Sequence, residues 1–226
     1  MCNFKKITQL LILLFFNYFV LFSQNIENKY LRKEIYLDSL NNFIDLYGNN
    51  KTIPENFKTE TIVALSFYPE LKETKIIFTD KKIRTTMQAV PGINFIFKSK
   101  KSRIYYIYFN NNKGKHKSID FGKFSFNSMV GIIGHELGHI SYYSHKNSIS
   151  IIENGFLYII CPKFKKKYEN NTDKIAIEHN LGYSLYENRL FLLTNPNIKE
   201  KSKIRTKKYY LSPEEIIEFI NIKAKK

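Results

Sequence analysis

The chain has few of the residues that cross-link or interrupt small folded domains. It holds two cysteines, six prolines, nine glycines and no tryptophan in 226 residues. Cys2 falls in an expected N-terminal targeting segment, so only Cys161 remains and no internal disulfide can form. No stretch is rich in proline or glycine and no internal repeat is present. About 200 residues are enough for one domain that is stabilised by its own hydrophobic core.

Acidic residues are also scarce. The formal net charge is +16, and removal of Lys5 and Lys6 with the N-terminal segment would lower it to +14. The basic residues gather at 98–103, 163–167 and 199–208, and such a field attracts anionic surfaces. No nucleic-acid-binding motif accompanies them, so we expect no nucleic-acid partner and consider an anionic envelope surface instead. The abundance of Lys, Asn, Ile, Phe and Tyr is also typical of an AT-biased genome, which weakens any functional interpretation of the charge.

One apolar run bears on localisation. Residues 7–22 are apolar, follow Lys5 and Lys6, and lead into Ser23 and Gln24. This order predicts a secretory signal peptide over residues 1–24 and an exported, periplasmic or secreted domain over residues 25–226. The alternative is an uncleaved N-terminal membrane anchor, because the run is near the lower limit for spanning a bilayer.

Residues 135–139 read His-Glu-Leu-Gly-His. Residues four apart share one face of a helix, so His135 and His139 could both bind one metal ion, and Glu136 lies beside the first histidine. The surrounding sequence favours a helix: Asn127 is the expected N-cap, and apolar residues recur at 129, 130, 133, 137 and 140, nearly opposite the histidines. A stripe of glycines predicts close approach by a neighbouring element: Gly131, Gly134 and Gly138.

A catalytic zinc site takes three protein ligands. Glu169 and Asp173 lie four residues apart on a second expected helix, so both acids share one face. Glu169 would complete a His2Glu set, and Asp173 would accept a hydrogen bond from the far nitrogen of a ligating histidine. His179 is a rival third ligand, although it points about 80° away from that face. The alternative is a solvated acid pair that offsets the basic residues 165–167.

Together, the His-Glu-x-Gly-His helix and the Glu-x-x-x-Asp helix that follows resemble the gluzincin branch of the zincin metallopeptidases. The resemblance covers residues 74–190 and implies zinc on His135, His139 and Glu169, Glu136 as general base and Asp173 in a supporting position. It also implies peptide-bond hydrolysis and a cleft-bordering strand that pairs with an extended peptide or protein substrate. The membrane-embedded relatives of this branch have several spanning helices, which the mature part of this chain lacks, so their substrates do not carry over.

The remaining pattern predicts an α+β fold with a small mixed sheet. We expect helices at residues 35–47, closed by Gly48, and at 54–68, with Pro54 at the first position. Strands are expected at 74–79, 93–98 and 103–109, the last two as a hairpin, with 103–109 as the strand beside the cleft. Residues 151–161 are apolar, and we expect them to form a buried helix or a wall of the cleft. Ser212 to Glu215 is a capping box that would open a terminal helix ending at Ile222.

The chemistry also requires a donor that stabilises the oxyanion. The sequence offers five candidates without choosing among them: Tyr142, Tyr143, His145, His179 and Tyr183. Two alternatives to an active peptidase stay open at this point. One is a zinc-binding but inactive protein with the same ligands, and the other is a cationic surface-binding module in which the motif arose by chance.

Overall fold

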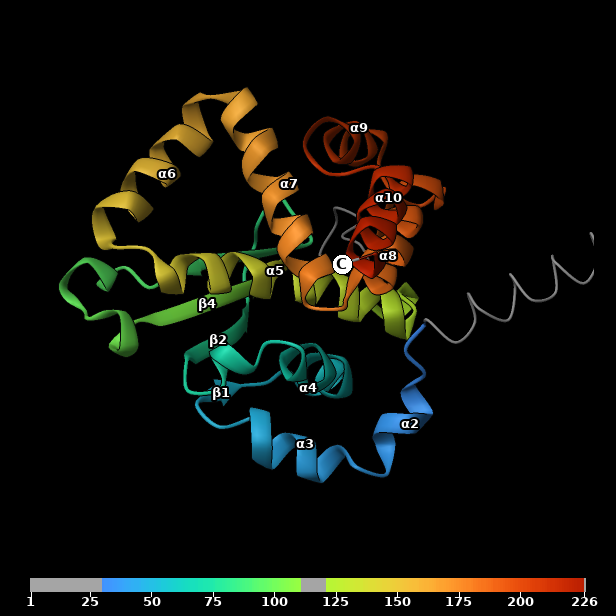
Figure 1. Ribbon diagram of the computed structural model, residues 1–226, viewed down its shortest axis with the longest axis horizontal. Helices are drawn as coiled ribbons and strands as arrows, with labels where there is room; N and C mark the ends of the chain where they lie inside the picture. Colours follow the sequence, from blue (N-terminus) through green and yellow to red (C-terminus); the bar gives the residue numbers. More distant parts are fainter. Residues whose placement is uncertain (1–29, 111–120, 226) are drawn as a thin grey trace, which may run out of the picture. The chain divides into compact units, whose positions relative to one another are not determined.

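The computed structural model describes residues 30–110 and 121–225, so the predicted signal peptide at 1–24 lies outside the described residues. The chain divides into two units, residues 1–31 and 32–226, and all elements below belong to the second. That unit is α+β: a four-stranded mixed sheet is followed by six long helices, α5 to α10 (Figure 1). Within the described residues, no helix combines the length and apolarity needed to cross a membrane.

The sheet has the strand order β1-β2-β4-β3. Its strands are β1 (Lys51–Thr52), β2 (Lys75–Asp80), β3 (Met87–Pro91) and β4 (Ile104–Phe109). β1, β2 and β4 are parallel, and β3 runs antiparallel to β4 with Ala89 opposite Ile107. The strand predicted at 74–79 is therefore confirmed, and β3 forms one edge of the sheet.

Two strand predictions were wrong. Residues 93–98 form a loop with the short 3₁₀ helix η3 (Phe95–Phe97), and Ile93 and Phe97 are exposed. The antiparallel partner of β4 is β3. This five-residue strand has one β-branched residue and a terminal proline, so its sequence is a weak signal for a strand. β4 is also not an edge strand, because β2 and β3 pair with its two sides. Its richness in Ile, Tyr and Phe indicated a strand but not its position in the sheet.

The first predicted helix is two helices, α2 (Lys33–Leu37) and α3 (Leu40–Tyr47), with Gly48 as the C-cap of the second. The second predicted helix begins as the 3₁₀ helix η1 (Glu55–Phe57) after Pro54 and continues as α4 (Lys58–Ser66). Four more 3₁₀ turns are short: η2 (Pro69–Leu71), η3, η4 (Lys100–Ser102) and η5 (Phe121–Lys123). Proline thus marks the start of the α4 region, one position before the first helical residue.

The central helix is α5 (Phe126–His145), which contacts α4, β3, α7 and α8, and Figure 1 shows it between α4 and α7. Its N-cap is Ser125, whose side chain accepts a hydrogen bond from the Ser128 backbone, and not Asn127. The apolar face is buried as predicted, and the core around it contains these fully buried side chains: Ile62, Leu65, Tyr68, Ile76, Tyr105, Ile107, Ile133, Leu137, Ile140, Leu181 and Leu185.

The glycines of α5 allow two helices to lie against its backbone. A Cβ atom on Gly131 would overlap the carbonyl oxygen of Ser184 in α8 (Gly182–Thr194). A Cβ on Gly138 would lie 3.2 Å from the carbonyl oxygen of Thr172 in α7 (Pro162–Glu178). The predicted close approach is therefore found, and it brings α7 against the histidine-bearing turns of α5.

Three further helices complete the unit: α6 (Ser148–Ile160), α9 (Glu200–Tyr209) and α10 (Pro213–Ala224). The capping box of α10 is present, since Ser212 and Glu215 exchange side-chain to backbone hydrogen bonds. α6 is helical as predicted, but it is not a buried helix. Ile151 is its one buried residue, while several of its large apolar side chains are exposed.

Candidate metal centre

His135, His139 and Glu169 converge at the contact of α5 with α7. Their ligand atoms all lie within 4.8 Å of one another, and all three residues are buried. The Glu169 Oε2 atom lies 3.2 Å from His135 Nε2 and 3.3 Å from His139 Nε2. The structure therefore holds a candidate metal site made of two imidazoles and one carboxylate.

The outer nitrogens of both histidines have partners that fix the tautomer. His135 Nδ1 lies 2.8 Å from Asp173 Oδ1, and a carboxylate can only accept, so Nδ1–H donates. His139 Nδ1 lies 3.1 Å from Thr172 Oγ1, whose own hydroxyl hydrogen goes to the Tyr168 carbonyl. The Thr172 oxygen must therefore accept from Nδ1–H. Each neutral imidazole is left with an Nε2 lone pair that faces Glu169.

Three acceptor atoms that face one another repel unless a cation lies between them. In a tetrahedral zinc site with ligand distances of about 2.0 to 2.1 Å, neighbouring ligand atoms are separated by roughly 3.3 Å. The separations of 3.2 and 3.3 Å between Glu169 and the two histidines match this value. The residues present therefore fit a metal ion held by two imidazoles and one carboxylate.

The same arrangement also attracts a proton. Burial lowers the pKa of His135, but its hydrogen bonds with Asp173 and Glu169 outweigh burial and raise the pKa to about 10. Burial would raise the pKa of Glu169, yet its contacts with both histidines hold that pKa well below the usual range. A metal cation competes with this proton, because an imidazole must be neutral to bind a metal.

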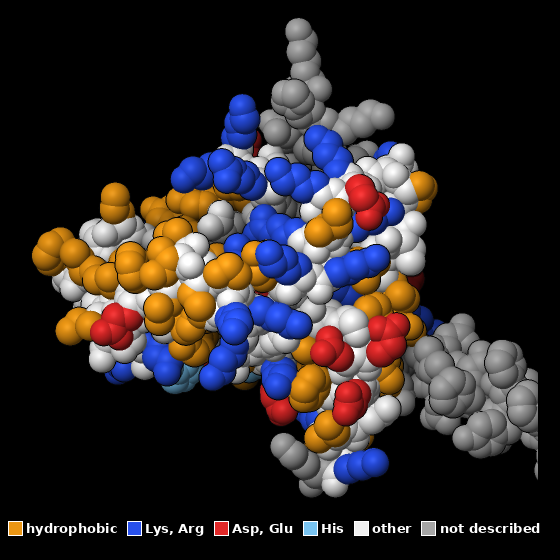
Figure 2. All heavy atoms as spheres, turned by 90° about the horizontal axis from the view of Figure 1, so that it is seen from above, with side chains coloured by type: hydrophobic (Ala, Val, Ile, Leu, Met, Phe, Trp, Pro, Cys, Tyr) orange, Lys and Arg blue, Asp and Glu red, His pale blue; other side chains and the backbone are white. Residues whose placement is uncertain are grey.

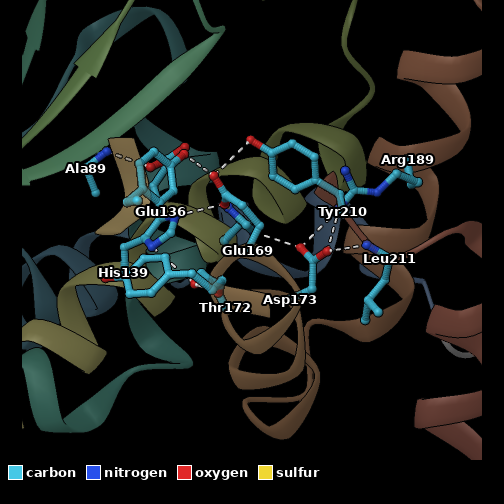
Figure 3. A network of polar contacts seen from close by, with 12 residues as sticks. Ala89, Glu136, His139, Glu169, Thr172, Asp173, Arg189, Tyr210 and Leu211 are labelled. Carbon is cyan, nitrogen blue, oxygen red and sulfur yellow. Dashed lines mark hydrogen bonds and ion pairs between the residues drawn. The ribbon is translucent and has the colours of Figure 1, made fainter. Parts of the chain in front are cut away.

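Asp173 is fully buried and joins the candidate site to the helices behind it (Figure 3). Besides the contact with His135, its carboxylate accepts hydrogen bonds from Arg189 Nη2 at 2.9 and 3.0 Å and from the Leu211 backbone at 2.9 Å. Arg189 comes from α8, and Leu211 precedes α10. The position of His135 thus depends on three elements that lie outside its own helix.

Glu136 lies on the β3 side of the candidate site and is buried. Its Oε2 atom accepts a hydrogen bond of 2.6 Å from the Ala89 backbone N–H. Thr86 and Gly92 form backbone hydrogen bonds with the β4 side of the sheet. In an antiparallel pair, residues whose backbone groups bond to the partner strand alternate with residues whose backbone groups point away from it. Ala89 therefore presents its backbone to the unpaired edge of β3. Burial raises the pKa of Glu136, while the two imidazoles and the Ala89 bond partly offset this rise.

Two adjoining cavities reach this site and share Glu136 in their walls. One, of about 660 Å³, is also lined by the apolar residues Val90, Ile151 and Ile159. The other, of about 270 Å³, borders α8 and α9. Basic side chains also line these cavities: Arg84, Lys165, Lys199 and Arg205. The cleft wall formed by α6 agrees with the second of the two sequence expectations for that helix.

Of the five predicted oxyanion donors, the cavity walls include Tyr143 but not the other four. His179, also the rival ligand, lies away from the metal site. Its ring stacks on Tyr68 at 4.1 Å, and its Nε2 lies 3.0 Å from Glu70. His179 is the C-cap of α7, and its side chain points to Tyr68 and to Glu70 of η2, away from the histidines of α5.

Sequence reasoning missed several residues around Glu169. Tyr158 donates a hydrogen bond to Glu169 Oε1, and the Tyr210 hydroxyl lies 3.4 Å from the same atom. Thr172 could have been found, because it sits between Glu169 and Asp173 on the expected helix. Tyr158, Tyr210 and Arg189 come from other elements, and no spacing in the sequence links them to the motif.

Comparison of the chain with protein-family models, with curated proteins and with solved structures finds no match.

Proposed function

We propose that the protein is a zinc-dependent peptidase of the gluzincin type. The observation that carries this proposal is the buried group of His135, His139 and Glu169, in which both histidines present Nε2 toward the same carboxylate oxygen. Such a His2Glu set, with Glu136 next to the first histidine, is the ligand pattern of catalytic zinc in peptidases. In this proposal Asp173 and Thr172 orient the two imidazoles.

A bound zinc ion would supply Lewis acidity, lowering the pKa of water to about 7 and polarising the scissile carbonyl. Glu136 removes the proton from the attacking water and returns it to the leaving amine. Its buried position favours this role, since a raised pKa brings a carboxylate closer to the working pH. The Ala89 N–H keeps the Glu136 carboxylate aimed into the cleft.

The free edge of β3 is the element best placed to bind an extended peptide. Pairing with this strand edge would use the Ala89 carbonyl and the backbone groups of its alternate neighbours, because the Ala89 N–H is bonded to Glu136. The cleft offers apolar walls from α6 and basic side chains from α9. We therefore expect substrates with an apolar residue on one side of the scissile bond and an acidic residue on the other.

Tyr143 and Tyr210 are the proposed oxyanion donors, whereas Tyr158 already donates its hydroxyl hydrogen to Glu169. All three line the cleft, and burial raises the pKa of each phenol above its ordinary value. A phenol that stays protonated can donate to a developing oxyanion. We further propose, from the sequence of residues 1–24 alone, that the protein is exported.

The test uses purified full-length protein, metal analysis and a peptide library. Wild type should hold one zinc per chain and cleave peptides. Glu136→Gln should retain zinc and lose cleavage by about 10² or more, whereas His139→Ala should lose both. Glu153→Gln, an exposed acid on α6, is the matched control and should behave as wild type.

Each other outcome has a meaning. Stoichiometric zinc without cleavage of any library member would favour an inactive zinc-binding protein. Absence of stoichiometric zinc would favour a chance motif on a cationic surface-binding module. Full cleavage by Glu136→Gln would remove Glu136 from the proposed mechanism.

A further inference from the structure

Helix α6 exposes an apolar face that no other described element covers. Phe156 is 61 % exposed and Ile159 is 81 % exposed, and three further isoleucines of the helix are also exposed: Ile149, Ile152 and Ile160. At about 100° per residue, these five side chains fall within an arc of about 100°. They form a continuous stripe whose centre lies about 130° around the helix from the buried Ile151, and the edge of the stripe at Ile152 and Ile159 also lines the larger cavity.

A second apolar element adjoins the start of this helix. The loop around η3 contacts α6, and Ser148 lies within hydrogen-bonding distance of the Phe95 carbonyl. In this loop Phe97 is 85 % exposed, and Ile93 and Ile96 are exposed as well. The α6 stripe and the η3 loop together are called the apolar tip below. Exposed apolar surface of this extent is uncommon in monomeric proteins and marks interaction sites.

The residues that flank the apolar tip are basic. Glu153 is the single acidic residue in the segments 93–103 and 146–167, whereas lysines occupy these positions: 98, 100, 101, 146, 163, 165, 166 and 167. Lys100 Nζ bonds the His145 carbonyl at the end of α5, and Lys165 lies over the Tyr158 ring of α6, so both segments border the helix. Figure 2 shows hydrophobic side chains gathered on this part of the face, with Lys and Arg side chains beside them.

We propose that the apolar tip docks the protein on an anionic lipid bilayer, with α6 lying in the interface. An interfacial helix needs an apolar stripe on one face and cations at its flanks, which meet acyl chains and anionic headgroups respectively. A protein partner would match the apolar stripe equally well, but the excess of lysine over acid around it favours a surface of uniform negative charge. Because α6 is also a wall of the larger cavity, docking would bring that cavity close to the membrane.

The absence of tryptophan from the chain gives a direct test. Phe156→Trp and Ile159→Trp each place one fluorescent reporter on the apolar tip. Leu46→Trp is the control, because Leu46 is similarly apolar and 48 % exposed but belongs to α3. Full-length variants are mixed with vesicles of phosphatidylglycerol and phosphatidylcholine, and with phosphatidylcholine alone.

Both tip reporters should shift to shorter wavelength with the anionic vesicles and be quenched by brominated acyl chains, while the control should do neither. Lys166→Gln combined with Lys167→Gln should raise the lipid concentration for half-maximal shift on the order of 20-fold, and added salt should act in the same direction. The measurement does not depend on peptidase activity, so it can be repeated with Glu136→Gln.

Three results would overturn the proposal. Tip reporters that respond like the control would show that α6 does not enter the bilayer, even if the N-terminal segment tethers the chain. An emission that is already short without lipid, and independent of protein concentration, would show that the chain covers its own tip. A short-wavelength emission without lipid that shifts to longer wavelength on dilution would show that a second copy of the chain covers the apolar tip.

Discussion

Replacement of Asp173 by asparagine should weaken both the fold and the metal site. The carboxylate is fully buried and accepts hydrogen bonds from His135, from Arg189 and from the Leu211 backbone. Asparagine has the same size, but its amide group would face one of these donors with a donor of its own. It would also leave the guanidinium of Arg189, which is 3 % exposed, without a counter-charge.

Breaking one side of a buried ion pair costs about 3–5 kcal/mol, a large part of a total stability of about 5–15 kcal/mol. Loss of the partner that orients a ligating histidine typically weakens metal binding by about 10- to 100-fold. Asp173→Asn should therefore lower the free energy of unfolding of the metal-free protein by several kcal/mol. It should weaken zinc binding within the 10- to 100-fold range.

The assays are urea unfolding of chelator-treated protein and zinc competition against a chromophoric chelator. Asp45→Asn, on the exposed side of α3, should stay within about 0.5 kcal/mol of wild type. Arg189→Met in the Asp173→Asn background removes the uncompensated charge. The double variant should therefore lose less free energy of unfolding than the sum of the losses of the two single variants. A loss below about 1 kcal/mol for Asp173→Asn, with wild-type zinc affinity, would refute this account of the site.

Three further outcomes are expected. Gly131→Ala should cost about 1–3 kcal/mol in urea unfolding because of its overlap with α8, whereas Gly155→Ala, with open space around it, should be neutral or stabilising by up to about 1 kcal/mol. Burial lowers the pKa of His179, but its bond with Glu70 outweighs burial and raises the pKa above 6.5. The stability from this pair should thus be present below about pH 6.5 and be lost as pH rises through the folded-state pKa; NMR titration of wild type and Glu70→Gln checks this. Zinc should be lost by about pH 5 in the presence of a chelator, because protons compete increasingly for both imidazoles as the pH falls, and zinc retained at pH 4 would argue against histidine ligands.

Local patterns were sufficient for the elements whose sequence carries a strong period or a cap. The α5 helix followed from its apolar spacing, the α10 start from Ser212 and Glu215, and β2 from its β-branched run. The shared face of His135 and His139, and that of Glu169 and Asp173, also followed from spacing, since residues four apart lie on one side of a helix. These features depend on residues within one or two turns of each other.

Tertiary structure decided what depends on pairing between distant segments. Ile93 and Phe97 have strand-like composition, yet β4 pairs with the weaker segment around Ala89, because that register buries Met87 and Ala89. The same pairing made β3 the free edge and placed the Ala89 N–H on Glu136. No local propensity encodes which strand lies at an edge.

The sequence alone thus determined which residues could bind a metal, because helical periodicity is a short-range property. Only the tertiary structure decided what surrounds them. Arg189 and Tyr210 reach Asp173 and Glu169 from later helices, and His179 turns away to Glu70. Only the packing of α7 and α8 against the glycines of α5 brings such distant side chains within hydrogen-bonding distance of the site.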